Sequence, residues 1–186
     1  METSTSTSLT ARSINKYSLI AAGAGLIPIP VIDLAAVSGV QFDMIRQLCI
    51  QYGVGFDPRR GKAWITSLTG TAFAHVGAVL VKLIPGIGSL VGGMSLSVSA
   101  GASTYALGRI VAQHLSNGGD MENLSIEQHR DAFKSYEEEG INVIIEMREE
   151  QTRANEKIEE LEKMHARGLI TDSEFNSVKA RVLAAV

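Results

Sequence analysis

The chain has 186 residues, a formal net charge of −3, 18 glycines and an aromatic content of only 5%, which excludes a conventional aromatic-rich core. The charge is unevenly divided, because residues 1–120 carry eight Lys/Arg and five Asp/Glu (+3), whereas residues 121–186 carry nine and fifteen (−6). Neither part has a basic stripe with interleaved aromatic residues, so nucleic acid is not an expected partner.

Composition divides the chain into four regions, and we expect an all-α fold. The polar, low-complexity start lacks the basic opening of a secretory signal and predicts disorder. An apolar, glycine-rich region follows, and then a charged region whose few apolar residues have helical spacing. The expected regions are a disordered tail at 1–11, a double-hairpin domain at 12–116, a charged helical stalk at 121–154 and a small helical hairpin at 155–186.

A first antiparallel helical hairpin is predicted where Pro28 and Pro30 interrupt a helical pattern that covers 13–27 and resumes over 34–48. Its leading leg would be only about 22 Å long, which suits a re-entrant or interfacial position at a membrane. A single Pro-kinked span over 17–40 is the alternative.

A second hairpin is predicted from two nearly uncharged legs, 63–84 and 88–112, which are joined by a turn at Pro85, Gly86 and Gly88. Legs on the order of 33 and 37 Å exceed the bilayer core of roughly 30 Å. Small residues recur every fourth position on both legs, and close approach through such residues is typical of helices in lipid. The predicted helix-packing residues are Gly70, Ala74, Ala78, Ser89, Gly93, Ser97 and Gly101.

The numbering pairs these small residues across the turn, and Thr66 is expected opposite Gly101. The two turns also align with each other, since Leu26 to Ile29 matches Leu83 to Gly86 at an offset of 57 residues. Seven of the eight Lys/Arg of residues 1–120 lie at the bases of the predicted legs, away from these turns. The positive-inside rule then places the bases in the cytoplasm.

The charged C-terminal region carries two capping boxes, which mark helix starts. The first, at Ser125 to Gln128, predicts the start of a helix whose apolar stripe is interrupted at Gly140. The second, at Thr171 to Glu174, follows Gly168, a residue type that commonly ends helices. Two such short helices have too small a core to stand alone, which predicts self-association. The residues expected at the oligomer interface are Ile158, Leu161, Leu169, Phe175, Val178 and Val182.

Three patterns that suggest chemistry fail on their spacing. The segment from Gly55 to Ala63 has one residue too many for a P-loop, and Ala63 stands where the metal-binding hydroxyl belongs. The glycines after Gly86 have the wrong spacing for a dinucleotide fingerprint. The four histidines lack metal-ligand spacing. We therefore expect no catalytic residues, no cofactor and no metal.

Two stretches resemble known families. Residues 15–119, with Ala22-Gly-Ala-Gly-Leu-Ile-Pro-Ile-Pro-Val-Ile-Asp33 and Lys82-Leu-Ile-Pro-Gly-Ile-Gly-Ser89, resemble the YcjF-like family, whose members are assigned to the inner membrane and have no defined function. Members often follow a GTPase domain or are encoded beside one, so the resemblance implies a GTPase partner. Residues 156–185 resemble the short C-terminal domain called SHOCT, whose usage implies oligomerisation or localisation.

Together these patterns predict a non-enzymatic, self-assembling protein of a bacterial inner membrane, anchored by helical hairpins, with its acidic tail in the cytoplasm. The lipid bilayer and further copies of the chain are the expected partners. The alternative is a soluble cytoplasmic homo-oligomer, a ring or shell whose glycine-rich hairpins are buried between subunits. Its support is a mean hydropathy of only +0.12.

Overall fold

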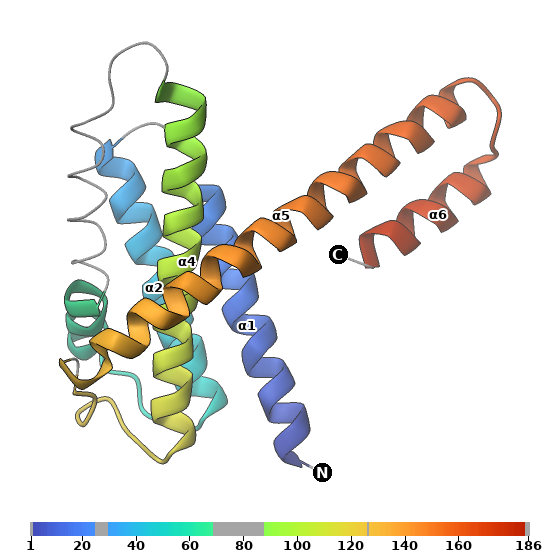
Figure 1. Ribbon diagram of the computed structural model, residues 1–186. Helices are drawn as coiled ribbons and strands as arrows, with labels where there is room; N and C mark the ends of the chain where they lie inside the picture. Colours follow the sequence, from blue (N-terminus) through green and yellow to red (C-terminus); the bar gives the residue numbers. More distant parts are fainter. Residues whose placement is uncertain (1, 25–29, 69–87, 126, 185–186) are drawn as a thin grey trace. The chain divides into compact units, whose positions relative to one another are not determined.

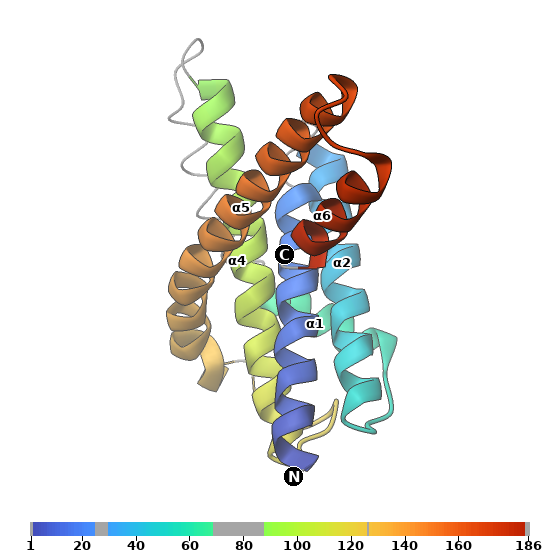
Figure 2. The same ribbon diagram turned by 90° about the vertical axis from the view of Figure 1, so that its right-hand side faces the viewer.

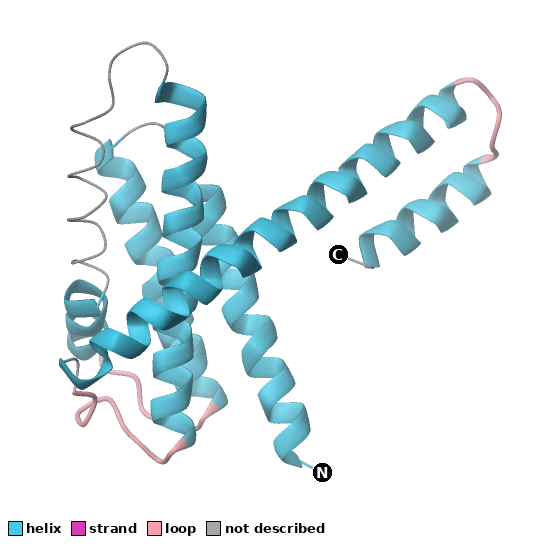
Figure 3. Ribbon diagram, in the orientation of Figure 1, coloured by secondary structure: helices cyan, strands magenta, loops and turns pink. Residues whose placement is uncertain are grey.

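The computed structural model describes residues 2–24, 30–68, 88–125 and 127–184, which form helices and loops without a strand (Figures 1 and 3). The all-α prediction is confirmed. Two compact units are present, Met1–Ile144 (unit 1) and Ile145–Val186 (unit 2). The helices are α1 (Glu2–Ala24), α2 (Pro30–Gln51), α4 (Gly88–Ser116), the 3-10 helix η1 (Glu127–His129), α5 (Arg130–Ala166) and α6 (Asp172–Ala184), with a further helical stretch at 58–68.

Helices α1 and α2 lie side by side and run antiparallel (Figure 2). Tyr17 donates a hydrogen bond to Asp43 Oδ2 at 2.9 Å, and Gln51 Nε2 donates one to Ser13 Oγ at 2.7 Å. Going along α1 from Ser13 to Tyr17, the partner on α2 changes from Gln51 to Asp43, so the two helices run in opposite directions, as in a hairpin. The single Pro-kinked span is wrong.

Two of the predicted turn residues begin helices. Pro30 is the first residue of α2, a position at which its missing N–H costs no hydrogen bond. Gly88 is the first residue of α4. The other predicted turn residues, Pro28, Pro85 and Gly86, lie outside the described residues.

Helix α1 begins at Glu2, so the disordered tail predicted for 1–11 is wrong. Thr10 is buried, and its Oγ1 donates to the hydroxyl of Tyr52 at 3.3 Å. Helix propagation is cooperative, so the later turns of α1, anchored by the buried Ile14 and Ala22, support the polar turns before them. Weak intrinsic helix propensity of Ser and Thr concealed this extension in the sequence.

Helix α4 is the buried axis of unit 1, and α1 and α2 pack against it. Most residues from 97 to 115 are buried, and such a helix needs neighbours on most sides. A Cβ atom added at Gly108 would lie 3.0 Å from Ile14, so the two backbones approach closely. The largest fully buried apolar side chains of unit 1 are Ile14, Val37, Met44, Ile45, Leu48, Leu68, Leu107, Ile110, Val111 and Ile144.

The first part of α5 is a wall of unit 1 rather than a solvated stalk. Phe133 and Ile144 are buried, and a Cβ atom at Gly140 would lie 3.0 Å from the Cα and carbonyl oxygen of Ala102 on α4. The helix predicted within 121–154 therefore contributes to unit 1 up to Ile144, and its thin apolar stripe packs on α4. Gly140 does not interrupt α5, which is continuous from Arg130.

No helix in the described part of the chain is both long and apolar enough to cross a membrane. Helix α4, which covers the leg predicted over 88–112, has the length, but small and polar residues lower its hydropathy. Most of the other predicted leg, 63–84, lies outside the described residues.

In unit 2, α6 follows the last turn of α5 through Gly168, which has φ of 69° and is followed by the predicted capping box. The backbone N–H of Leu169 donates to the carbonyl of Met164 at 3.0 Å, closing the end of α5. Thr171 N donates to Glu174 Oε2 at 2.9 Å, and Glu174 N donates to Thr171 Oγ1 at 3.3 Å. These reciprocal bonds confirm the capping box.

Replacing Thr171 with alanine should unfold the start of α6 locally. The change removes the Oγ1 acceptor that satisfies Glu174 N, and loss of such a cap costs about 1 kcal/mol. Amide hydrogen exchange should become faster in 172–176 and stay unchanged in α4. Equal protection of α6 in both proteins would show that the cap does not hold this helix.

Candidate functional site

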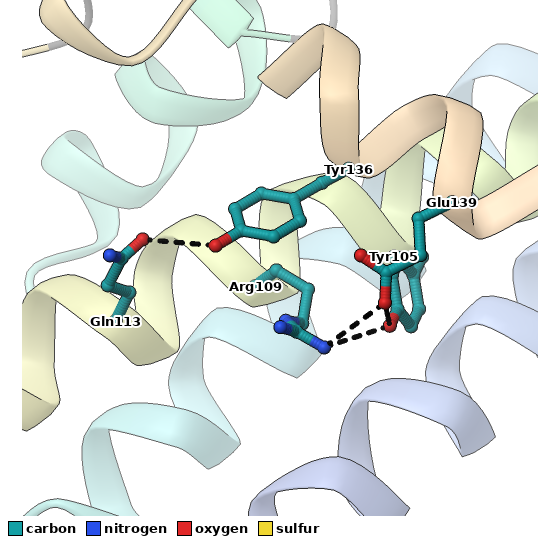
Figure 4. A network of polar contacts seen from close by, with 5 residues as sticks. All are labelled: Tyr105, Arg109, Gln113, Tyr136 and Glu139. Carbon is teal, nitrogen blue, oxygen red and sulfur yellow. Dashed lines mark hydrogen bonds and ion pairs between the residues drawn. The ribbon is translucent and has the colours of Figure 1, made fainter. Parts of the chain in front are cut away.

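A polar network joins α4 to α5 in unit 1 (Figure 4). Tyr105, Arg109 and Gln113 lie four residues apart on α4, so they share one face of that helix. Tyr136 and Glu139 reach them from α5. The network therefore links two helices through charged and hydroxyl groups, beside the apolar contact at Gly140.

Arg109 lies at the centre of the network. Its Nη1 donates to the hydroxyl of Tyr105 at 3.0 Å and approaches Glu139 Oε1 at 3.5 Å, and Tyr105 donates to the same carboxylate oxygen at 2.7 Å. The guanidinium lies 4.9 Å from the ring centroid of Tyr136, whose hydroxyl donates to Gln113 Oε1 at 3.3 Å. Hydrogen bonds and cation–π contacts thus hold the guanidinium in one orientation.

The two charged members are partly open to solvent, with side-chain exposures of 42% for Arg109 and 46% for Glu139. Water screens such a pair, so its contribution to stability is small. Tyr105 is buried, and burial together with the hydrogen bond to Glu139 raises its pKa. The network therefore favours the neutral phenol and orients it; it does not prepare a nucleophile.

The raised pKa of Tyr105 should be visible in how the free energy of unfolding changes at alkaline pH. Its folded pKa is raised above the ordinary value of 10.0, so the stabilisation is complete below pH 10 and is lost as pH rises through the folded pKa. Denaturant titrations from about pH 9 to 11 should show a falling free energy of unfolding, and Tyr105→Phe should flatten that fall. Burial and a hydrogen bond to Asp43 also raise the pKa of Tyr17, so Tyr17→Phe is measured in parallel. An unchanged alkaline slope in Tyr105→Phe would contradict the assignment.

A groove of about 390 Å³ lies beside the network, between α1, α4 and α5. Its lining has one cation, Arg109, and no carboxylate, and the apolar part includes Ile14. Guanidinium and hydroxyl donors in this arrangement suit a small polar or anionic group. The hydroxyl groups of the lining come from Thr7, Thr10, Tyr52, Ser116 and Tyr136.

Two of the predicted helix-packing residues can be placed with their neighbours. Ser97 is buried and its Oγ donates to the carbonyl of Ala22, while a Cβ atom at Gly101 would lie 2.9 Å from both Ala22 Cβ and Ile144 Cγ1. The predicted partner of Gly101, Thr66, is exposed and bonds to the carbonyl of Lys62. The small residues Ser97 and Gly101 of α4 thus face α1 and α5.

The remaining predicted packing residues cannot be placed in this way. Ser89 and Gly93 belong to α4, but their side chains lie outside the described part of the structure. Gly70, Ala74 and Ala78 lie outside the described residues altogether.

The residues predicted for oligomerisation line unit 2 without filling a core. No residue of α6 is buried, and Leu169 is 65% exposed. The other five are half-buried between α5 and α6, namely Ile158, Leu161, Phe175, Val178 and Val182.

Chemistry-bearing groups are few among the described residues. No group of three or more His, Cys, Asp or Glu lies together there in a way that could hold a metal ion. Cys49 is buried, and burial raises the pKa of its thiol, which keeps it protonated. Its Sγ lies 3.4 Å from Met121 Sδ in the core.

Sequence reasoning missed Arg109 and Glu139 as partners and Gly140 as a packing residue. The charge pair is separated by 30 residues, and no local pattern connects its members. Gly140 did carry a signal, because a glycine in an otherwise strong helical pattern implies close approach by a neighbouring backbone.

The comparisons with known proteins place this bundle in a family. A protein of Magnetospirillum gryphiswaldense, named magnetosome membrane protein 22, is 41% identical over 132 residues, which cover 68% of each chain. No solved structure matches the chain. Residues 4–136, which span α1 to the first turns of α5, match the family described as domain of unknown function DUF697. The chain belongs to the DUF697 family.

Proposed function

We propose that this protein is a non-enzymatic, membrane-associated protein that assembles through unit 2. The observation that carries the proposal is the 41% identity to a protein named as a membrane protein of the magnetosome. The identity extends over 132 residues, and residues 4–136, which match the family, lie within unit 1. The proposed location is the inner membrane of a bacterium, with the acidic C-terminal region in the cytoplasm.

Charge distribution supports association with a membrane. Residues 1–120 carry a net charge of +3, and Lys and Arg near an anionic lipid surface are attracted to it. Residues 121–186 carry −6 and would be repelled by the same surface. The acidic part is therefore proposed to stay in water.

The proposed assembly rests on the thin core of unit 2. Leu169 and Leu183 are 65% and 58% exposed, and the apolar side chains between α5 and α6 are only half-buried. Two helices of this length bury too little apolar surface to be stable alone. A second copy of unit 2 would cover these side chains, in keeping with the resemblance of this segment to SHOCT.

Cell fractionation tests the membrane proposal. The full chain, expressed in a bacterium, should be recovered in the membrane pellet, and its release by carbonate then separates surface binding from insertion. A large soluble particle obtained without detergent would overturn the proposal and favour a soluble homo-oligomer. Light scattering of the purified full chain tests assembly: Phe175→Ala should lower the particle mass, whereas a monomeric wild-type protein would exclude assembly through unit 2.

A further inference from the structure

The outer surface of the α1–α2 layer combines basic and large apolar side chains. On α1, Leu9, Arg12, Lys16 and Ile20 follow each other at intervals of three or four residues, so they share one helical face. All four are exposed, with Leu9 at 52% and Ile20 at 45%. The α1 face therefore carries two cations and two large exposed apolar side chains.

Helix α2 presents the same combination. Arg46 and Ile50 lie four residues apart on one face, both are exposed, and Ile50 is 61% exposed. Asp43 lies on this face as well and accepts the hydrogen bond from Tyr17. The α2 face therefore contributes one cation, one anion and one large apolar side chain.

The two faces lie on the same side of the α1–α2 layer. Ile14 on α1 and Met44 on α2 both contact the position of Gly108, so these residues mark the sides that face α4. Arg12 and Lys16 on α1, and Arg46 on α2, lie on the opposite sides of their helices by the helical period.

Tyr17 connects the two faces across the seam between the helices. Its hydroxyl donates to Asp43 on α2, and its ring lies 5.9 Å from the Lys16 ammonium. Arg46 is close enough to act on the same phenol, whose pKa it lowers against the raising effect of burial and Asp43. The basic residues of both helices therefore form one surface.

The chemistry of this surface identifies its occupant. Its cations Arg12, Lys16 and Arg46 outnumber its one carboxylate, and none of the three forms an ion pair with another described residue. Cations beside large apolar side chains suit the headgroup region of an anionic bilayer, where the cations meet phosphate and the apolar side chains reach the acyl boundary.

We propose that the outer surface of the α1–α2 layer, formed by Leu9, Arg12, Lys16, Ile20, Arg46 and Ile50, binds anionic phospholipid. This inference rests on the proposed membrane association and specifies the lipid class and the residues that recognise it. The cations contact phosphate groups, and Leu9, Ile20 and Ile50 enter the boundary between headgroups and acyl chains. Long basic side chains suit this position because their stems are apolar.

Flotation of the purified full chain with vesicles tests the surface. One set of vesicles is neutral phosphatidylcholine, and the other contains 30 mol% phosphatidylglycerol as the probe lipid (about 30% anionic charge). The variant Arg12→Gln/Lys16→Gln/Arg46→Gln should bind the anionic vesicles on the order of 100-fold more weakly, since each cation near the surface contributes about fivefold. Raising the salt concentration to about 0.5 M should reduce wild-type binding strongly.

A matched variant controls for net charge. Lys134→Gln/Lys157→Gln/Arg167→Gln removes the same three charges from exposed positions on or after α5 and should bind like the wild type. A second variant, Leu9→Ser/Ile50→Ser, keeps the cations and should bind more weakly at both salt concentrations. All of these positions are exposed, so the fold should be retained, which circular dichroism checks.

The outcomes separate the surface from the broader proposal. The proposal that this surface binds lipid would be contradicted if the wild type and the Arg12/Lys16/Arg46 variant bound the anionic vesicles equally. It would also be contradicted if the control variant lost as much vesicle binding as that variant. Failure of the wild type to bind either vesicle would also overturn it, while recovery of the chain in cellular membranes would leave the membrane proposal standing. Binding to neutral vesicles as strong as to anionic ones would show that the cations do not recognise the lipid.

Discussion

Replacing Ile144 with alanine should lower the free energy of unfolding of unit 1 by about 2–4 kcal/mol. Ile144 is fully buried although it lies in a charged helix, and its side chain packs on Gly101 of α4. Truncation removes three methyl or methylene carbons from this contact and leaves a cavity that α4 and α5 cannot close without shifting. Denaturant unfolding followed by circular dichroism measures the change.

The next residue provides a matched control. Ile145 is 43% exposed, so Ile145→Ala removes the same atoms from a partly exposed position. Its effect should be within about 0.5 kcal/mol of zero, because surface substitutions away from special features are nearly neutral. If the two variants lose the same stability, α5 does not pack on α4 at this level.

Replacing Gly140 with alanine should lower the free energy of unfolding by about 1–3 kcal/mol, because the added methyl group contacts backbone atoms, which cannot change rotamer as a side chain can. The new Cβ would lie 3.0 Å from the Cα and carbonyl oxygen of Ala102 and 3.1 Å from Tyr105 Cβ. Helices α4 and α5 would have to separate, which also strains the bond from Tyr105 to Glu139.

Gly39 is the control for this substitution. It lies inside α2 with no atom within 4 Å of an added Cβ. Gly39→Ala should therefore raise stability by up to about 1 kcal/mol, since alanine has the better helix propensity. Opposite signs for the two changes are the expected result, and stabilisation by Gly140→Ala would contradict the close crossing of α4 and α5.

Local chemistry could be predicted from the sequence where it involves neighbouring residues. The proline pair indicated the break between α1 and α2, and Pro30 begins α2 because its fixed φ suits a first helical turn. The capping box at Thr171 and Glu174 forms as its spacing indicates. The box predicted at Ser125 lies two residues before the 3-10 helix η1, which runs directly into α5.

The partners of the small residues on α4 could not be predicted from periodicity. A ridge of glycine, alanine and serine shows that some backbone approaches closely, but not which one. At Gly101 the neighbours are Ala22 and Ile144, which lie 79 residues before and 43 residues after it.

The polar network was equally inaccessible from the sequence. Arg109 is the single charged residue of α4 apart from histidine, and Glu139 stands in an acidic run that resembles an ordinary solvated face. Only the crossing of α4 and α5 brings them within 3.5 Å and places Tyr105 between them. The place of Leu9 on the exposed α1 face was likewise concealed, because residues 1–11 were expected to be disordered.

Hydrogen exchange along α4 and α5 tests the central claim that α4 is the buried axis of a bundle and that the first part of α5 is one of its walls. Mass spectrometry of the full chain should show slow exchange in residues 97–115 and 130–144 and faster exchange in 145–166 and in α6, where few side chains are buried. A single rate along the whole of α5, with α4 exchanging as fast as α6, would contradict the account.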